Sequence, residues 1–247
     1  MTKLISVTGK GGVGKTTVSA LLIKNLLAAG KSPVLAIDAD PNSCLDAALG
    51  VHVTNTVGRA REEVRDSAKT NTSISKRELL KLKIESGLVE ADRFDLIAMG
   101  RPEGAGCYCY ANDILKDVIT EISSHYPYVV LDNEAGLENL SRRIVQKMDL
   151  MILVSDASNA GMKTLLRLHE LTKEMEMSYS KLALVINRLR NGKFPDKMDE
   201  IREKTGAETV IGLPDDEEVA IFAETSRSYF EISDSNAVYR EVSRLLL

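Results

Sequence analysis

GKGGVGKTT, the stretch Gly9–Thr17, decides how the rest of this chain folds. An apolar run of strand character precedes it at 3–8, and a segment with helical periodicity follows it at 16–30. This strand–turn–helix setting is the one in which the pattern G-x-x-x-x-G-K-[ST] binds phosphate. Glycines let the backbone approach a polyphosphate closely, and the N-terminus of the following helix adds favourable partial positive charge. The stretch therefore predicts a P-loop.

The P-loop prediction gives a role to the individual residues of the stretch. Lys15 is expected to place its ammonium group between the terminal phosphates, and Thr16 to offer its hydroxyl to Mg²⁺. A second lysine, Lys10, lies inside the loop. The nucleotide-binding residues predicted here are Gly11, Gly12, Val13, Gly14, Lys15, Thr16 and Thr17.

Apolar runs and helical patterns alternate along the remaining chain. Strands are predicted at 3–8, 32–40, 94–99, 127–132, 149–155, 181–187 and 208–213. Helices are predicted at 16–30 and at about 111–124, 138–147, 160–176, 195–205, 215–224 and 234–247. Nearly continuous apolar strands that alternate with helices indicate a parallel sheet covered on both faces. The expected fold is therefore α/β, with a doubly wound, mostly parallel sheet flanked by helices.

Residues 52–92 interrupt this alternation with a polar and charged segment. We expect two or three helices and loops there, either as a solvated helical excursion or as a partner-binding surface. No linker composition separates the segment from its surroundings. The chain is therefore expected to form one P-loop domain over residues 1–247.

The composition of the chain limits which cellular locations and partners are expected. The 247 residues carry a net charge of −4, which provides no general attraction to nucleic acid or to an anionic membrane. The N-terminal sequence has no signal-peptide pattern, and no apolar run approaches 18 residues. Three cysteines in such a chain indicate cytosolic thiols rather than a disulfide framework. A cytoplasmic protein with no nucleic-acid or membrane partner is expected.

The loop with its additional lysine, KGGVGKTT, resembles the deviant Walker A ATPases, which share K-G-G-x-G-K-[ST]-[ST]. That group includes the Min and Par positioning ATPases, the nitrogenase iron protein and several metallocentre-assembly ATPases. The resemblance implies ATP and ADP as ligands and an ATP-bound homodimer. It also implies that Lys10 reaches the partner's nucleotide, where it neutralises charge on the transferring phosphoryl group. The alternative is that Lys10 only adds local positive charge.

Three aspartates lie at the ends of predicted strands, at the edge where α/β proteins bind ligands. Asp38 and Asp40 lie in AIDADP, and Asp132 follows four apolar residues in VVLDNEAG. Asp132 fits the Walker B carboxylate that holds Mg²⁺, and Asp38 is expected to support the Mg²⁺ shell. By resemblance, Asp40 directs the attacking water. The alternative is that Asp38 and Asp40 are ordinary caps at the end of the strand. Gly136 closes a D-x-x-x-G pattern that resembles a γ-phosphate sensor, and the roles of the two residues after Asp132 stay open.

The base is expected to lie between two late segments. LVINR ends a strand with Asn187, whose amide can pair with adenine, and Arg188 flanks it. The loop GLPDDEEVA resembles the segment that covers the other side of the base, through Leu213, Pro214 and Asp215. In this order after a P-loop, the two segments favour ATP over GTP.

Cys107 and Cys109 lie in GAGCYCYAND, after a predicted strand. They admit three interpretations: core cysteines, a redox pair or metal ligands. Metal ligation accounts best for the C-x-C spacing, because a twofold dimer completes a four-thiolate site from two copies. Thiolates bind Zn²⁺, Cu(I) and Fe–S clusters and also take Ni²⁺. Cys44, at a predicted helix start, is expected to be a buried core residue.

The C-x-C loop beside a deviant Walker A loop looks like the accessory ATPases that assemble the nickel-containing cluster of carbon monoxide dehydrogenase. This resemblance implies a homodimeric, ATP- and/or metal-dependent metallochaperone ATPase. It would hold Ni²⁺ or Zn²⁺ through Cys107 and Cys109 and serve carbon monoxide dehydrogenase as its client. The rival interpretations are a positioning ATPase of the Min or Par type and an iron–sulfur scaffold ATPase.

Overall fold

The computed structural model describes residues 2–67, 74–100, 109–135 and 147–246, with side chains for all of these except 66, 67 and 109–115. The strands are β1 (Lys3–Gly9), β2 (Val34–Asp38), β3 (Val89–Glu90), β4 (Phe94–Ala98), β5 (Tyr128–Asp132), β6 (Lys147–Asp156), β7 (Ser178–Leu189) and β8 (Thr209–Pro214). The helices are α1 (Lys15–Ala28), α2 (Leu45–Leu49), α3 (Val57–Ser67), α4 (Lys76–Ser86), α5 (Cys109–Ser123), α7 (Asn159–Glu174), α8 (Met198–Thr205), α9 (Glu217–Glu224) and α10 (Ala237–Ser243). Short 3₁₀ turns are η1 (Arg190–Gly192), η2 (Tyr229–Glu231) and η3 (Arg244–Leu246).

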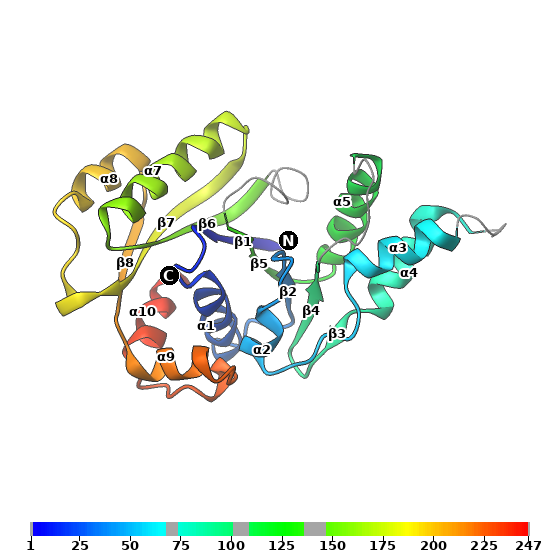
Figure 1. The fold of residues 1–247 in the computed structure, drawn as a ribbon, viewed down its shortest axis with the longest axis horizontal. Helices are drawn as coiled ribbons and strands as arrows, with labels where there is room; N and C mark the ends of the chain where they lie inside the picture. The colour runs from blue at the N-terminus through cyan, green and yellow to red at the C-terminus, as the bar shows by residue number, and fades with distance from the viewer. Residues whose placement is uncertain (1, 68–73, 101–108, 136–146, 247) are drawn as a thin grey trace.

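The described strands form one eight-stranded sheet in the order β3-β4-β2-β5-β1-β6-β7-β8 (Figure 1). Every neighbouring pair is parallel except β3 with β4, which is antiparallel. The predicted doubly wound, mostly parallel α/β fold is confirmed. The strand β1 lies inside the sheet between β5 and β6, so the P-loop that follows β1 opens at the middle of the carboxyl edge.

Helices cover both faces of the sheet because its strands are apolar on both sides. One apolar cluster joins the sheet to α3, α4, α5, α7 and α8. A second cluster joins the opposite face to α1, α2, α9 and α10. The helix α1 is buried around most of its circumference, and Leu21, Leu22, Ile23 and Leu26 have no exposed surface. This burial fixes the helix that opens at the P-loop.

Some predicted boundaries need correction. The C-terminal helix predicted at 234–247 begins only at Ala237 and gives way to a 3₁₀ turn at Arg244. The helix predicted at 138–147 lies outside the described residues except for Lys147, which begins β6. The short antiparallel strand β3 was not predicted, because its two residues carry no detectable alternation.

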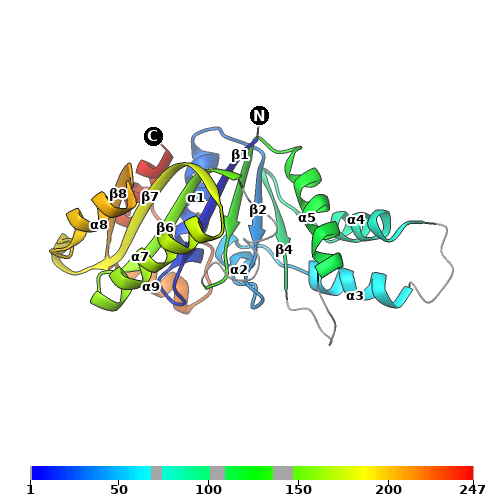
Figure 2. The same cartoon turned by 90° about the horizontal axis from the view of Figure 1, so that it is seen from above.

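The segment 52–92 contains α3, α4 and β3. A capping box begins α4: the Ser75 hydroxyl accepts from the Glu78 backbone N–H, and the Glu78 carboxylate accepts from Ser75. Lys81 and Arg77 of α4 pair with Glu121 of α5 at 2.5 and 3.1 Å. The three helices α3, α4 and α5 thus gather beyond one edge of the sheet, at the opposite end from α8 (Figure 2).

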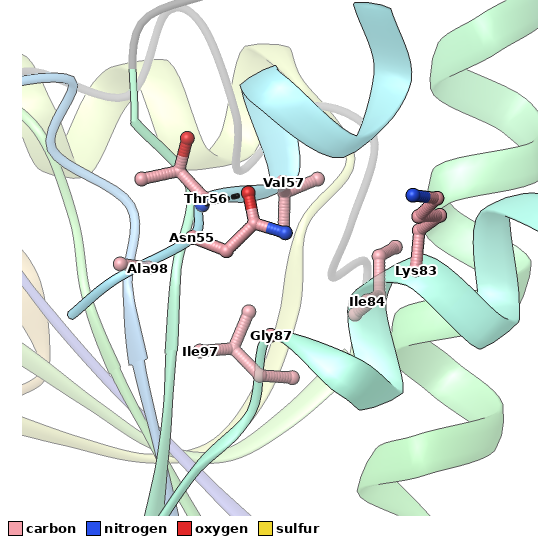
Figure 3. A pocket seen from close by; sticks show the side chains of 8 residues that line it. All are labelled: Asn55, Thr56, Val57, Lys83, Ile84, Gly87, Ile97 and Ala98. Carbon is pink, nitrogen blue, oxygen red and sulfur yellow. Dashed lines mark hydrogen bonds between the residues drawn. The ribbon is translucent and has the colours of Figure 1, made fainter. Parts of the chain in front are cut away.

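A small pocket lies where the α3–α4 pair meets β4 (Figure 3). Its lining residues are Asn55, Thr56, Val57, Lys83, Ile84, Gly87, Ile97 and Ala98. Just beyond β4, Gly100 has φ 61°, and a Cβ there would lie 2.5 Å from the Thr56 hydroxyl oxygen. Only glycine therefore fits where the chain leaves β4 beside α3. The pocket shares no residue with the predicted nucleotide site.

Candidate functional site

The P-loop joins β1 to α1 through two residues in the left-handed region. Gly12 has φ 77° and Gly14 has φ 95°. A Cβ on Gly12 would meet nothing within 4 Å, whereas a Cβ on Gly14 would lie 2.4 Å from Nδ2 of Asn187. Glycine is therefore needed at position 14 for two reasons: the positive φ of its backbone and the close approach of Asn187.

The two lysines of the loop differ in exposure. Lys15, the first residue of α1, is 8% exposed, and its Nζ donates to the Lys10 carbonyl at 3.4 Å. The side chain of Lys10 is exposed. Lys15 is thus held within the loop's own concavity, where a bound phosphate chain would lie, whereas Lys10 is accessible to a second molecule.

Asp132 ends β5 and lies directly beneath the start of α1. Its Oδ2 accepts from the Thr16 hydroxyl at 2.7 Å, and its Oδ1 accepts from the Ser19 hydroxyl at 3.0 Å. The carboxyl group is 1% exposed, and this burial, together with the charge of Asp38, raises its pKa to about 7. Ser19 was not predicted, although its spacing of three from Thr16 places both hydroxyls on one face of the helix.

Asp38 ends β2 and lies beside Asp132 in the register of the sheet. Its two carboxylate oxygens accept from the backbone N–H groups of Asp40 at 3.0 Å and Leu45 at 2.9 Å. Burial raises the pKa of Asp38 to about 6, and the two N–H groups oppose that rise. Asp38 therefore shapes the loop after β2 and also adds negative charge next to Asp132.

Asp40 lies half-buried in that loop. Its Oδ1 accepts from the backbone N–H of Asn42 at 2.8 Å and from the Asn42 side-chain amide at 3.0 Å. The three predicted aspartates therefore gather on two adjacent strands and the loop between β2 and α2. All three lie at the edge of the sheet where the P-loop opens.

The pair Asp38 and Asp132 provides the test of whether magnesium fits. Burial raises the pKa of both carboxyl groups, and the negative charge of Asp38 adds to the rise at Asp132, so a positive charge beside the pair would be favourable. Carboxylate and hydroxyl oxygens are the protein ligands that Mg²⁺ prefers. Asp132 and Thr16 supply both kinds of oxygen in one contact, so the residues fit the ion.

The base-side segments converge on the P-loop from β7 and β8. Asn187 donates through Nδ2 to the Val13 carbonyl at 2.8 Å and accepts the Arg188 backbone N–H at 2.9 Å. Arg188 is exposed and has φ 56°. Pro214 is half-buried and Asp215 is exposed at the end of β8. Asn187 therefore contacts the P-loop directly, and the predicted role of these residues toward a base stays a prediction.

Leu213 corrects that prediction in part. Its side chain has no exposed surface and packs in the apolar cluster around α1. Because alternate residues of β8 point to opposite faces of the sheet, Leu213 belongs to the core and its side chain cannot cover a base. For Pro214 and Asp215, contact with a base stays a prediction.

Comparison with known proteins places this geometry in a family. Residues 2–184 match the AAA_31 family, which is described as an AAA domain. The chain belongs to the AAA_31 family. An uncharacterized ATP-binding protein of Methanocaldococcus jannaschii is 38% identical over 98% of this chain and 96% of its own length. The carbon monoxide dehydrogenase accessory protein CooC of Rhodospirillum rubrum is 30% identical over 69% of each chain.

Solved structures share the fold of this AAA_31 protein. A ParA family ATPase from Chlorobium tepidum TLS superposes with a TM-score of 0.73 at 19% identity, over 100% of this chain and 98% of that chain. The septum site-determining protein MinD of Pyrococcus horikoshii OT3, complexed with Mg-ADP, superposes with a TM-score of 0.68 at 19% identity, over 99% and 94%. None of the helices in the described part of this chain combines the length and apolar character needed to cross a bilayer.

Two further residues near the P-loop of this AAA_31 protein were not predicted from the sequence. The Tyr229 hydroxyl of η2 lies 3.1 Å from the Thr17 hydroxyl, and the tyrosine is 4% exposed. Asp156, at the end of β6, accepts from the Ser158 backbone N–H at 2.8 Å. Hydrogen bonding to Ser158 lowers the pKa of Asp156, and the positive charge of Lys10 adds to the effect. No local sequence motif predicts either residue, because only the order of strands in the sheet brings their segments close to the P-loop.

The cysteine predictions have different outcomes. Cys107 and Gly136 lie outside the described residues, and Cys109 is described only as the backbone start of α5. Within the described ranges, no group of three or more His, Cys, Asp or Glu side chains is arranged to hold a metal ion. Cys44 was expected in the core, but it is exposed. It precedes α2, where desolvation and the nearby carboxylates raise the pKa of its thiol.

Proposed function

We propose that this AAA_31 protein is a magnesium-dependent ATPase that works as a homodimer. The observation that carries the proposal is the buried contact between Asp132 and the Thr16 hydroxyl at the start of α1. It joins a strand-end carboxylate to the P-loop, and this is the arrangement that holds a metal–polyphosphate complex. The likeness to ATP-binding relatives supports ATP and ADP as the nucleotides.

In this proposal the P-loop backbone from Gly11 to Thr17 binds the phosphates, and Lys15 lies against the terminal ones. Thr16 and Asp132 hold Mg²⁺, with Asp38 as a supporting charge, and the ion when bound neutralises phosphate charge. Asp40 accepts a hydrogen bond from the attacking water and orients it toward the terminal phosphate. Its half-buried position and its contact with Asn42 hold its carboxylate at the mouth of the site.

Lys10 acts in the nucleotide site of a partner copy. Its exposure and its place inside the P-loop support this role, because a cation that serves only its own site would be expected to point inward as Lys15 does. Asn187, Arg188, Pro214 and Asp215 then receive the adenine base. ATP binding and dimer formation are coupled in this arrangement, since each copy completes the other's site.

The finer proposal is a metallochaperone that carries Ni²⁺ or Zn²⁺ for carbon monoxide dehydrogenase through Cys107 and Cys109. The C-x-C motif and the relationship to CooC support it. The motif lies in the connection between Gly100, which packs on Thr56, and the start of α5.

A positioning ATPase of the ParA or MinD type is the second candidate. The fold likeness to a ParA family ATPase and to MinD favours it, over nearly the whole chain. Such a protein needs a membrane-binding or nucleic-acid-binding surface, and the net charge of −4 gives no general attraction to either. The C-x-C motif has no role in that candidate function.

Two measurements test these proposals. Phosphate release from ATP should require Mg²⁺ and should be lost in Lys15→Ala, which removes the phosphate-binding cation. Elemental analysis with size-exclusion mass measurement should find about one metal per dimer in the native chain, in line with a four-thiolate site, and none in Cys107→Ala/Cys109→Ala. Cys44→Ala is the matched control, because it removes an exposed thiol outside the C-x-C motif. Equal metal content in all three proteins would exclude the shared thiolate site.

A further inference from the structure

The side chain of Asn187 is bonded to the P-loop itself. Its Nδ2 donates to the carbonyl oxygen of Val13 at 2.8 Å, across 174 positions of sequence. Its Oδ1 accepts the Arg188 backbone N–H at 2.9 Å, which fixes the direction of the amide plane. The amide is thereby pinned at one end to its own strand and at the other to the loop between β1 and α1.

The next residue, Gly14, leaves room for this contact because it has no Cβ. Gly14 follows Val13, has φ 95°, and leaves a place where a Cβ would lie only 2.4 Å from Nδ2 of Asn187. Gly12 also has a positive φ, yet its surroundings within 4 Å are open. Of these two positive-φ glycines, only Gly14 therefore has another segment close by, and the approaching group is the Asn187 amide.

The contact leaves the amide only partly used. A side-chain amide carries two N–H donors and an oxygen with two lone pairs, and the two bonds described here use one donor and one lone pair. The second donor and the second lone pair remain for a base. One side chain can therefore bind a purine and hold the P-loop at the same time.

We infer that Asn187 is a positioning residue that holds the P-loop in its phosphate-binding shape, independently of any contact with the base. This inference deepens the proposed ATPase function, on which it rests for its ligand. Loss of the bond leaves the Val13 carbonyl without that donor and frees the loop next to Gly14. Binding of the phosphate chain alone should then weaken, because the loop has to be ordered when the anion binds.

The first test requires no nucleotide. Hydrogen exchange of peptides that span the P-loop is compared by mass spectrometry for the native chain, Asn187→Ala and Asn187→Asp. One lost hydrogen bond corresponds to roughly three- to tenfold faster exchange in the loop, with unchanged exchange in β8. Asn187→Asp keeps the size and the oxygen that accepts from Arg188 but loses the donor, so it should show the same acceleration. Unchanged exchange in both variants would overturn the inference.

The second test uses a phosphate chain without a base. Magnesium tripolyphosphate and ATP are titrated against the native chain, Asn187→Ala and the control Pro214→Ala, which alters the base side without touching Val13. The inference expects Asn187→Ala to bind tripolyphosphate roughly three- to tenfold more weakly, with KM for ATP raised more than kcat is lowered. Pro214→Ala should bind tripolyphosphate normally. An Asn187→Ala variant that loses only ATP affinity would reduce Asn187 to a base contact and overturn the inference.

The two proposals fail in different ways. If the native chain binds neither ATP nor tripolyphosphate, the proposed ATPase function is wrong, and hydrogen exchange alone decides the role of Asn187. If the native chain binds both and Asn187→Ala matches it for tripolyphosphate, the ATPase function stands and the positioning role is rejected.

Discussion

Replacing Asp132 with asparagine should stabilise the metal-free protein while abolishing ATP hydrolysis. The native carboxyl is buried, with its pKa raised to about 7, chiefly because burial disfavours its charged form. The same group in the unfolded chain titrates near 3.8. An asparagine keeps the shape and carries no charge, so it removes the cost of holding a carboxylate in this place.

The size of the effect follows from these values. Each unit of pKa difference corresponds to 1.36 kcal/mol, so the native carboxyl destabilises the fold by roughly 4 kcal/mol at pH 8. Asparagine cannot accept from both Thr16 and Ser19 as a carboxylate does, which costs about 1 kcal/mol. The expected net gain for Asp132→Asn is roughly 3 kcal/mol at pH 8.

The stability difference between the native chain and Asp132→Asn should depend on pH. A carboxyl whose folded pKa lies above its unfolded value stabilises the fold when protonated, and that contribution is lost as pH rises from about 4 to about 7. The native chain should therefore lose stability over this range relative to Asp132→Asn. At pH 5 the folded carboxyl is largely protonated, and the gap between the two proteins should narrow to below about 1 kcal/mol.

Urea unfolding in the presence of EDTA measures this directly, at pH 5 and at pH 8. Asp92→Asn serves as the control, because the Asp92 side chain is 99% exposed and its replacement should change stability little at either pH. If Asp132→Asn is no more stable than the native chain at pH 8, the electrostatic reasoning is refuted. The same holds if the gap between them is equal at pH 5 and pH 8.

Three further changes test other parts of the structure. Gly14→Ala should weaken ATP binding much more than Gly12→Ala, measured by titration, because both strain the backbone but only Gly14 adds a clash with another segment. Tyr229→Phe should raise KM for ATP about three- to tenfold, the effect of one lost hydrogen bond, if its hydroxyl orients Thr17, whereas an unchanged KM would show that it does not. Burial lowers the pKa of His169, so the native chain should lose stability relative to His169→Gln as pH falls below about 6.5, and urea unfolding at pH 7 and pH 5 checks this.

Contacts between distant segments explain most of what the sequence did not predict. The bond from Tyr229 to Thr17 joins residues 212 positions apart, and the bond from Asn187 to Val13 joins residues 174 apart. A propensity or a motif describes neighbours along the chain, so neither contact has a local signal. Leu213 was misjudged for a related reason: its motif suggested a base contact, but the pleat of β8 turns its side chain into the core.

The sequence by itself determined the P-loop, the alternation of strands and helices, and the strand-end positions of Asp38 and Asp132. These features are local: glycines, a strand and a helix start within a few residues set the phosphate loop. Only the tertiary structure decided that Asp132 contacts Thr16 and Ser19, that Cys44 is exposed, and that Asn187 reaches the P-loop. The order of strands in the sheet brings these residues together, and that order results from packing two apolar faces, which no single segment encodes.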